Sequence, residues 1–304
     1  MSIVEYIKPK GENGFGYGST ALEVTEGIDL KGKTFLVTGC NSGLGKETAR
    51  VLALRGGKVI GTARTSEKAK EAIQEIGGFA GYACELSEPS SIRSCIAEIV
   101  KDKHTLDAII CNAGIMALPN LEKKFGYELQ FITNHIGHFI LVNGLLGQLS
   151  EYGRVILVSS TAHTAAPISG IDFDNLDGSK GYRPWTFYGQ SKFANLLFAK
   201  ELARRFSGTK KTAFALHPGV IKTNLSRHMG GVVNFLFGTL GALFLKTIPQ
   251  GAATQTYLAT APNVESKSGY YYADCNPAFS RPDADNASLA KKLWEVSESI
   301  VEKL

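Results

Sequence analysis

Tyr188 and Lys192 are the residues whose types and spacing could do proton chemistry. Side chains four residues apart lie on the same face of a helix, and the apolar residues from Phe193 to Phe206 recur with helical spacing. A tyrosine phenol ordinarily has a pKa of about 10, and an ammonium group beside it favours the phenolate and lowers that pKa. The pair therefore predicts a proton donor to a carbonyl oxygen, or an acceptor from an alcohol.

A glycine-rich turn lies far upstream of this pair. A strand-like run ending at Thr38 passes into the pattern T-G-x-x-x-G-x-G, and a helical pattern follows from Lys46 to Leu54. Glycines let a phosphate approach the backbone closely, and a helix N-terminus supplies N–H groups and positive potential. A dinucleotide site is predicted here, with an ordinary glycine-rich turn as the alternative. Its candidate residues are Gly39, Asn41, Ser42, Gly43, Leu44 and Gly45.

Arg64 directly follows the next strand-like run, residues 58–63. In a dinucleotide-binding fold, an acidic residue at this position would hold the adenosine ribose of NAD. An arginine can pair with the 2′-phosphate of NADP, which an acidic residue would repel. The position favours NADP(H) over NAD(H).

Polar residues also follow later strand-like runs. Glu85 and Leu86 follow the run 79–84 and are candidates to meet the adenine. Asn112, with Ala113 and Gly114, follows the run 106–111 and is predicted to brace the strand ends or to face the cofactor, with bracing the simpler role. Asn134 lies among apolar residues of a long helix predicted over 123–149, as a satisfied core amide or as part of the site.

The order of these patterns predicts the architecture. Seven strand-like runs with helices between most of them indicate an α/β fold, a doubly wound parallel sheet with helices on both faces. Such sheets bind ligands along the carboxyl edge, where the glycine turn and the later strand ends would meet. Residues 1–30 are expected to form an N-terminal arm with a short helix near 21–26, and 31–304 a single domain.

Composition argues against several functions. Of 304 residues 44% are hydrophobic, which is ample for a globular core, and the net charge of +5 is spread along the chain, so nucleic-acid binding has no support. Five cysteines without a C-x-x-C pair, and His135 and His138 without further ligands, predict no metal site. No signal-like segment or membrane-spanning run is present, and a cytoplasmic location is expected.

The chain resembles the short-chain dehydrogenase/reductase family. The markers, in family order, are the glycine turn, Asn112-Ala113-Gly114, Ser160, Tyr188-x-x-x-Lys192 and Pro218-Gly219. The stretches 133–139, 188–192, 217–220 and 293–297 are most similar to the retinol dehydrogenase-like group, which includes the WW-domain oxidoreductase and Tic32-like proteins. The resemblance implies a Rossmann-type domain.

The resemblance also implies roles for single residues. Tyr188 would be the general acid/base, with Lys192 lowering its pKa and holding the nicotinamide ribose. Ser160 would bind the substrate oxygen, and Asn134 would hold a water linking Lys192 to solvent. In the loop after the last strand, Thr223 would meet the nicotinamide carboxamide, beside the further cofactor-binding candidates Pro218, Gly219 and Val220.

Residues 225–248 would form a lid over the substrate, and their apolar composition suggests an apolar, lipid-like carbonyl compound or alcohol. Contact with a membrane surface or another subunit, or burial as an ordinary core helix, would explain the same composition. Family members usually pair through the helices around Asn134 and Tyr188, which is compatible with a homodimer here. The function implied is NADP(H)-dependent hydride transfer. The alternatives are an NADP(H)-binding sensor or scaffold, and a reductase of carbon–carbon double bonds.

Overall fold

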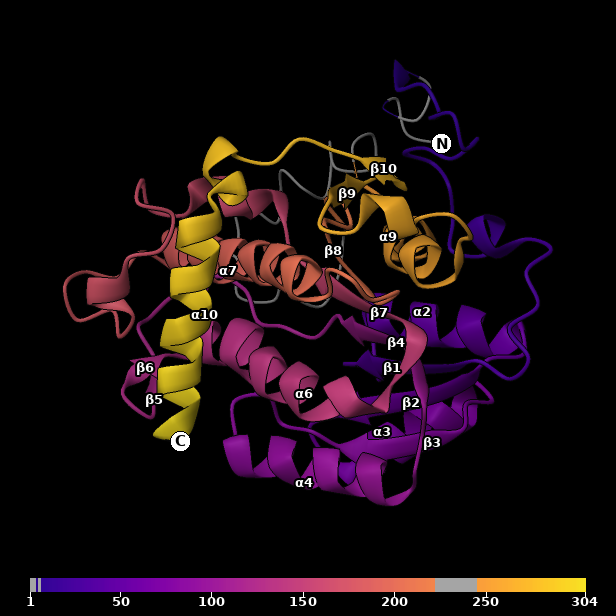
Figure 1. Cartoon of the computed structure of the whole chain (residues 1–304), viewed down its shortest axis with the longest axis horizontal. Coiled ribbons are helices and arrows are strands. Elements are labelled where there is room, and N and C mark those ends of the chain that lie inside the picture. Colours follow the sequence, from indigo (N-terminus) through magenta and orange to yellow (C-terminus); the bar gives the residue numbers. More distant parts are fainter. Residues whose placement is uncertain (1–3, 5–6, 222–244) are drawn as a thin grey trace.

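The computed structural model describes residues 4, 7–221 and 245–304. Its centre is an eight-stranded sheet with the order β10-β9-β8-β7-β4-β1-β2-β3 (Figure 1). The strands are β1 Thr34–Thr38, β2 Lys58–Ala63, β3 Ala80–Ala83, β4 Leu106–Cys111, β7 Leu149–Val158, β8 Thr212–Leu216, β9 Tyr271–Ala273 and β10 Asn276–Pro277.

The predicted doubly wound sheet is confirmed, with one strand more than the seven expected. All neighbouring strands from β3 to β9 pair in parallel, whereas β10 pairs antiparallel with β9. Asp274 and Cys275, with φ of 52° and 64°, turn the chain back at once after β9. A pairing of only two residues leaves no strand-length pattern in the sequence, so the extra strand could not be read from it.

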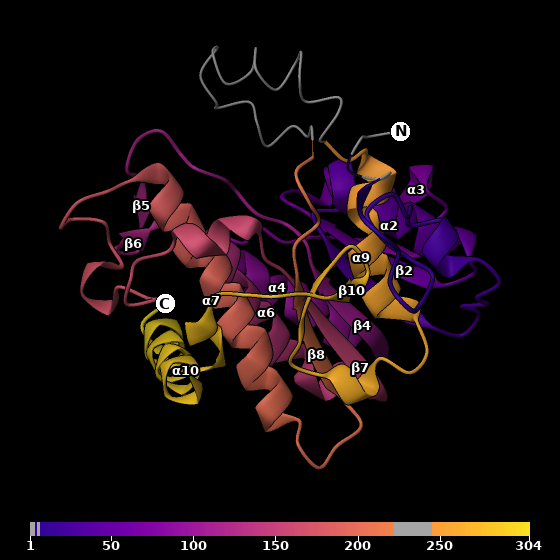
Figure 2. The same cartoon turned by 90° about the horizontal axis from the view of Figure 1, so that it is seen from above.

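Helices cover both faces of the sheet (Figure 2). Along β1 the side chains alternate, so that Phe35 and Val37 pack toward one face and Leu36 packs into the core on the other. The first face carries α2 Gly43–Leu54, α3 Ser66–Glu75 and α9 Ile248–Thr260, and the second carries α4 Pro89–Lys101, α6 Gly137–Leu145 and α7 Pro184–Arg205.

The long helix predicted over 123–149 is shorter and less regular than expected. Its first residues form a hairpin of β5 Lys123–Lys124 and β6 Tyr127–Glu128, because Phe125 and Gly126 turn the chain with φ of 52° and 82°. The Glu128 side chain then caps α5 Leu129–Phe131 by accepting from the Phe131 N–H at 2.9 Å. A π-helical segment, Ile132–Ile136, leads into α6, and a 3-10 turn Leu146–Gln148 ends the helix.

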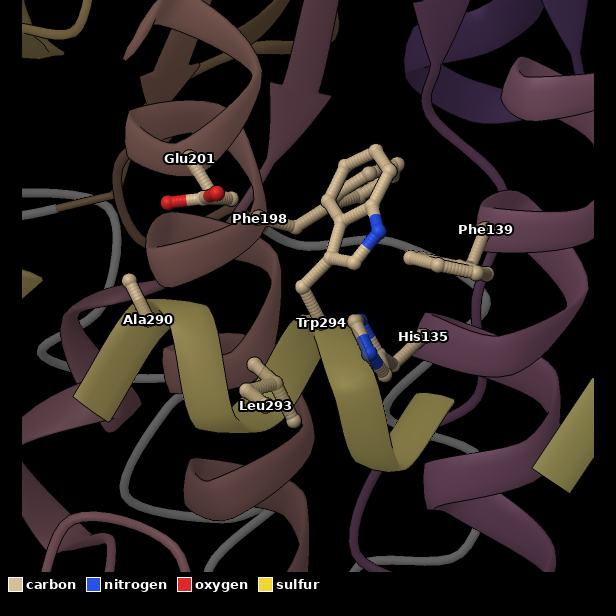
Figure 3. A pocket seen from close by; sticks show the side chains of 7 residues that line it. All are labelled: His135, Phe139, Phe198, Glu201, Ala290, Leu293 and Trp294. Carbon is tan, nitrogen blue, oxygen red and sulfur yellow. The ribbon is translucent and has the colours of Figure 1, made fainter. Parts of the chain in front are cut away.

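The C-terminal helix α10, Ala287–Glu302, packs across α6 and α7 (Figure 3). The Trp294 ring lies 4.9 Å from the ring of Phe139 and 5.6 Å from that of Phe198. The guanidinium of Arg205 lies 3.7 Å from the centre of the Trp294 ring. Helix α10 thus covers a face of the two helices on which subunit pairing was predicted, and the homodimer stays a prediction.

The N-terminal arm contacts the far end of the chain. Lys8 forms an ion pair of 2.8 Å with Asp274, Asn13 donates to the Cys275 carbonyl at 2.8 Å, and Ala21 N donates to the Pro249 carbonyl at 2.9 Å. In place of the short helix expected near 21–26 there is a 3-10 turn, Glu23–Thr25. The division into arm and domain stays a prediction.

Two expectations fall wholly or largely outside the described residues. Thr223 is one, and residues 225–244 of the predicted lid are the other. Within the described part of the chain, none of the helices combines the length and apolar character needed to cross a membrane.

Candidate active site

The sequence-predicted site residues meet at the carboxyl edge of the sheet. The parallel register pairs Thr38 with Thr62, and Val158 with Leu216, so the loops that follow these strands leave the sheet on the same side. Each of six parallel strands is followed by a loop that carries a predicted site residue. After β1, β2, β3, β4, β7 and β8 these are, in turn, Gly39, Arg64, Glu85, Asn112, Ser160 and Pro218.

Ser160 and Tyr188 are brought together by β7 and α7. Ser160 precedes a 3-10 turn, Thr161–Ala165, where its Oγ accepts from the Ala162 N–H at 3.1 Å. The Ser160 side chain also lies close enough to the buried Tyr188 phenol to lower its pKa. Gly189 allows this approach, because a Cβ at that position would lie 2.4 Å from the Ala162 carbonyl oxygen.

Lys192 is buried next to them, and its Nζ donates to the Val158 carbonyl at 3.1 Å. The same Nζ lies 5.8 Å from the centre of the Tyr188 ring. Burial lowers the pKa of Lys192 to about 8. A fully buried ammonium lacks solvation by water, and deprotonation relieves that cost.

The pKa of Tyr188 shifts opposite to the prediction. Burial raises it to about 12, and the hydrogen bond with Ser160 offsets part of that rise. The spacing of Tyr188 and Lys192 was read as lowering the pKa, but burial of the phenol outweighs its neighbours here. The depth of a side chain in the fold cannot be read from a four-residue spacing.

Asn134 lies in the π-helical segment and joins two parts of the site. Its Oδ1 accepts from the Ile115 N–H at 2.8 Å, while its Nδ2 donates to the Ile115 carbonyl and to Ser191 Oγ, each at 2.9 Å. A Cβ at Gly114 would lie 2.9 Å from Asn134 Oδ1 and 3.3 Å from Lys192 Nζ. The hydrogen bonds make Asn134 a satisfied buried amide, placed beside the loop that adjoins Lys192.

The glycine turn has the geometry of a phosphate cradle. Gly39 and Gly43 adopt φ of 69° and 56°, and a Cβ on Gly45 would lie 2.2 Å from the Gly39 carbonyl oxygen. Ser42 precedes α2, and among the described residues no side chain caps the helix there and no acid lies in its first turn. By contrast, the Thr65 side chain caps α3. The free N–H groups of α2 fit the pyrophosphate of a dinucleotide.

The other residues of the turn differ in exposure. Asn41 is exposed, beside the start of α2. Leu44 instead packs against the buried cluster of Ala21, Val51 and Ala252. Leu44 therefore anchors the turn to the core, and only its backbone remains as a candidate contact to a phosphate.

Arg64 extends from the end of β2 beside this turn. The Thr62 carbonyl accepts from the N–H groups of Gly39 and Cys40 at 2.9 and 3.0 Å, which ties the end of β2 to the turn. Arg64 is exposed, and its side chain has no ion-pair or hydrogen-bond partner among the described residues. The nearby cation Lys46 is instead paired with Glu75 at 2.6 Å. Among the described residues, Arg64 is thus a cation at the end of β2 that is free to meet an anionic ligand.

At the ends of β3 and β4, the side chains are held by local hydrogen bonds. Glu85 Oε1 accepts from the N–H and the hydroxyl of Ser87 at 3.2 and 3.1 Å, and Leu86 is buried. Asn112 donates to the Thr38 carbonyl at 2.9 Å and accepts from Gln255 at 3.2 Å. These bonds support the bracing role of Asn112. Ala113 follows it, with its N–H donating to Thr38 Oγ1 at 3.0 Å.

Beyond β8, the chain turns through Pro218, Gly219 and Val220. Gly219 adopts a φ of 91°, and its N–H donates to His217 Nδ1 at 3.1 Å. The Val220 carbonyl accepts from the Lys246 N–H at 2.9 Å, while the Val220 side chain is exposed. This turn lies at the same sheet edge as the glycine turn.

Two supporting serines escaped the reading of the sequence. Ser159 Oγ donates to the Lys192 carbonyl at 2.7 Å, which fastens the end of β7 to α7. Ser191 Oγ accepts from Asn134 and donates to the Tyr188 carbonyl at 2.8 Å. Both are neighbours in sequence of predicted site residues, which was the available signal, although spacing alone does not tell which serine supports and which acts.

Comparisons with known proteins agree with this geometry. Residues 33–173 match the family model described as short chain dehydrogenase. The chain is 40% identical to the short-chain dehydrogenase TIC 32 A, chloroplastic, of Brassica napus, over all of both chains. It is 38% identical to retinol dehydrogenase 14 of Homo sapiens, covering 90% of this chain and 87% of the relative.

A solved structure of an uncharacterized protein from Mycobacterium Paratuberculosis matches with a TM-score of 0.75 and 31% identity, over 94% of this chain and 98% of that one. Sequence relatives of this identity over nearly the whole chain, with the same fold, establish common ancestry. The chain belongs to the short-chain dehydrogenase family.

Proposed function

We propose that this protein is an NADP(H)-dependent oxidoreductase acting on the carbonyl or alcohol group of an apolar aldehyde, ketone or alcohol. The observation that carries the proposal is the placement of Ser160 and Tyr188 beside Lys192, at the sheet edge that also holds the start of α2, which no side chain of the described residues caps. Membership of a dehydrogenase family supports oxidoreductase chemistry.

The residues divide the work between binding and proton transfer. A bound nicotinamide supplies or accepts the hydride at the substrate carbon. Ser160 donates a hydrogen bond to the substrate oxygen, and Tyr188 gives that oxygen a proton or takes one from it. Lys192 holds the nicotinamide ribose, and the glycine turn with the start of α2 holds the pyrophosphate. Candidates for the other cofactor contacts are Arg64, Glu85, Leu86, Asn112, Ala113, Gly114, Pro218, Gly219, Val220 and Thr223.

Two features support the choice of cofactor and substrate. Arg64 is a cation with no ion-pair partner in the described part of the chain, at the strand end where a ribose phosphate would lie, which favours NADP(H). One relative is named a retinol dehydrogenase, and retinol is an apolar alcohol. A cytoplasmic location stays a prediction, and the name of another relative places that protein in the chloroplast.

The test is oxidation of NADPH and of NADH by the purified protein over aldehydes and ketones ranging from short and polar to long and apolar. We expect turnover with NADPH that rises with the apolar length of the substrate and yields an alcohol. Faster turnover with NADH would contradict the argument from Arg64. A product that keeps its carbonyl and loses a double bond would point to the alternative reductase.

Tyr188→Phe separates an enzyme from a cofactor-binding sensor. We expect the variant to bind NADPH with unchanged affinity and to lose turnover by about a hundredfold or more, since only the proton donor is removed. Binding is measured by fluorescence titration and turnover by NADPH absorbance. Full turnover in the variant would remove Tyr188 as the acid. Tight binding without turnover on any substrate by the unmodified protein would favour the sensor.

A further inference from the structure

His163 is a buried histidine that the proposed chemistry does not use. It lies three residues after Ser160, and its Nδ1 is 2.6 Å from the Ser160 carbonyl oxygen. The backbone N–H of Arg281 donates to its Nε2 at 3.3 Å. A carbonyl only accepts and a backbone N–H only donates, so both bonds are made at once only by the neutral ring with its proton on Nδ1.

Aromatic and cationic groups hold the ring in this orientation. Its centroid lies 5.1 Å from that of Tyr271 at 70°, and 6.5 Å from that of Phe193 at 15°. The Arg281 guanidinium lies 4.7 Å over the Phe193 ring and is held by Asp283 at 2.6 and 2.8 Å. His163 is therefore wedged between α7, β9 and the segment after β10.

Arg281 also forms hydrogen bonds with the far end of the loop that begins at Ser160. Its Nη1 donates to the Ala166 carbonyl at 3.2 Å, and its Nη2 donates to the Pro167 carbonyl at 3.1 Å. The loop is thus fixed at its start through His163 and at its end through Arg281. Both attachments come from a segment more than a hundred residues later in the chain.

The start of this loop determines where the Ser160 hydroxyl lies. Ser160 has an extended backbone, with φ of −159° and ψ of 157°, and its carbonyl accepts from both the backbone N–H and the Nδ1 of His163. Rotation about ψ of Ser160 would break these bonds. A rigid backbone lowers the number of positions open to Oγ, which must meet both Tyr188 and a substrate oxygen.

We propose that His163 is a positioning residue for Ser160: its Nδ1–H holds the Ser160 carbonyl and thereby fixes where Ser160 Oγ lies beside Tyr188. The inference rests on the proposed function in treating these two hydroxyl groups as the ones that act on substrate. Both ring nitrogens bond to backbone groups, and the Tyr271 hydroxyl lies farther from Nδ1, at 3.4 Å, so the role assigned to His163 is to hold Ser160 and not to exchange a proton.

Two variants of His163 distinguish the contribution of Nδ1 from that of Nε2. In His163→Asn the side-chain N–H can take the place of Nδ1–H and still hold the Ser160 carbonyl. In His163→Gln the longer amide reaches the place of Nε2 and leaves that carbonyl without its side-chain donor. We expect His163→Gln to lower kcat by about tenfold to a hundredfold with KM within about twofold, and His163→Asn to keep most of the activity.

The decisive measurement is a double-variant cycle. If His163 acts through the Ser160 hydroxyl, His163→Gln lowers kcat in the unmodified protein but has little further effect in Ser160→Ala, whose hydroxyl is already gone. A general loss of structure would instead lower kcat by the same factor in both backgrounds. Equal factors, or equal activity of the Asn and Gln variants, would overturn the proposal.

Amide hydrogen exchange tests the contact between His163 and Ser160 without relying on the proposed function. Without any substrate, peptides covering residues 159–166 are expected to exchange faster in His163→Gln than in His163→Asn or the unmodified protein. Equal exchange in all three would show that the Nδ1 contact does not hold the loop. If the unmodified protein reduces no carbonyl compound, the proposed function fails, and the exchange result alone decides the contact between His163 and Ser160.

Discussion

At the scale of single residues, burial of the Lys192 ammonium group makes the folded protein less stable. The pKa of Lys192 in the folded chain is about 8, below its ordinary value of 10.5. Between these values the unfolded chain binds more protons than the folded one, so the free energy of unfolding rises with pH across this window. Below pH 8 the folded chain bears the whole cost of the buried ammonium, as expected for a group kept for chemistry and not for stability.

Lys192→Met should therefore stabilise the fold while abolishing function. We expect its free energy of unfolding at pH 7 to exceed that of the unmodified protein by about 3 kcal/mol, with the gap closing as the pH approaches 10.5. The Val158 carbonyl loses one donor but keeps Asn195 Nδ2 at 3.4 Å. Urea unfolding from pH 7 to 10 measures the gap, with the exposed Lys291→Met as control. A gap that is absent at pH 7, or independent of pH, would contradict the cost assigned to burial.

At the scale of elements, the start of α2 depends on close backbone packing. A Cβ on Gly45 would meet the Gly39 carbonyl oxygen at 2.2 Å and Asn112 Nδ2 at 2.5 Å, so Gly45→Ala must push the turn away from the end of β4. We expect this variant to weaken NADPH binding by about tenfold or more, since the N–H groups of the helix lose their alignment. In Gly147→Ala the new methyl group meets open space, which makes it the matched control. Equal dissociation constants for the two variants, from fluorescence titration, would show that the cradle is not built this way.

The same scale shows where sequence reasoning succeeds and where it stops. The strands at 58–63, 106–111 and 212–216 were predicted with their observed bounds, because buried apolar runs between turn residues are a local signal. The π-helical segment around Asn134 was missed, since its irregular turn leaves no change in apolar spacing. The direction of the Tyr188 pKa and the contact of His163 with Arg281 both depend on burial and on distant segments. Residue types and spacing thus pointed to most of the site, whereas tertiary packing determines its electrostatics.

At the scale of the whole molecule, α10 decides which surfaces remain free. It places Trp294 against Phe139 of α6 and Phe198 of α7, and Ser297 Oγ lies 2.8 Å from His135 Nε2. A homodimer formed by this face of α6 and α7 would have to displace these contacts. Sedimentation equilibrium distinguishes the two cases: a mass of 32.7 kDa means one chain, and twice that mass means that the predicted homodimer pairs through another surface.

Trp294 is the residue that we expect to fix α10 in place. Burial of its indole N–H also lowers the stability of the fold. The Trp294 side chain is buried, but its Nε1 has no hydrogen-bond partner within the described part of the chain. Trp294→Ala should lower the free energy of unfolding by about 3–5 kcal/mol, because the aromatic contacts are lost and a cavity is left. Trp294→Phe keeps an aromatic ring and removes the unpaired N–H, whose burial costs about 1–3 kcal/mol, so its loss should be much smaller.

Urea unfolding of the two variants, with the exposed Glu295→Ala as control, separates packing from polarity. Equal losses of unfolding free energy in Trp294→Ala and Trp294→Phe would contradict this reasoning. They would mean that the indole N–H has a hydrogen-bond partner and that the packing of the ring contributes little. If Trp294→Ala instead changes the sedimenting mass from one chain to two, α10 also keeps a pairing surface of α6 and α7 covered.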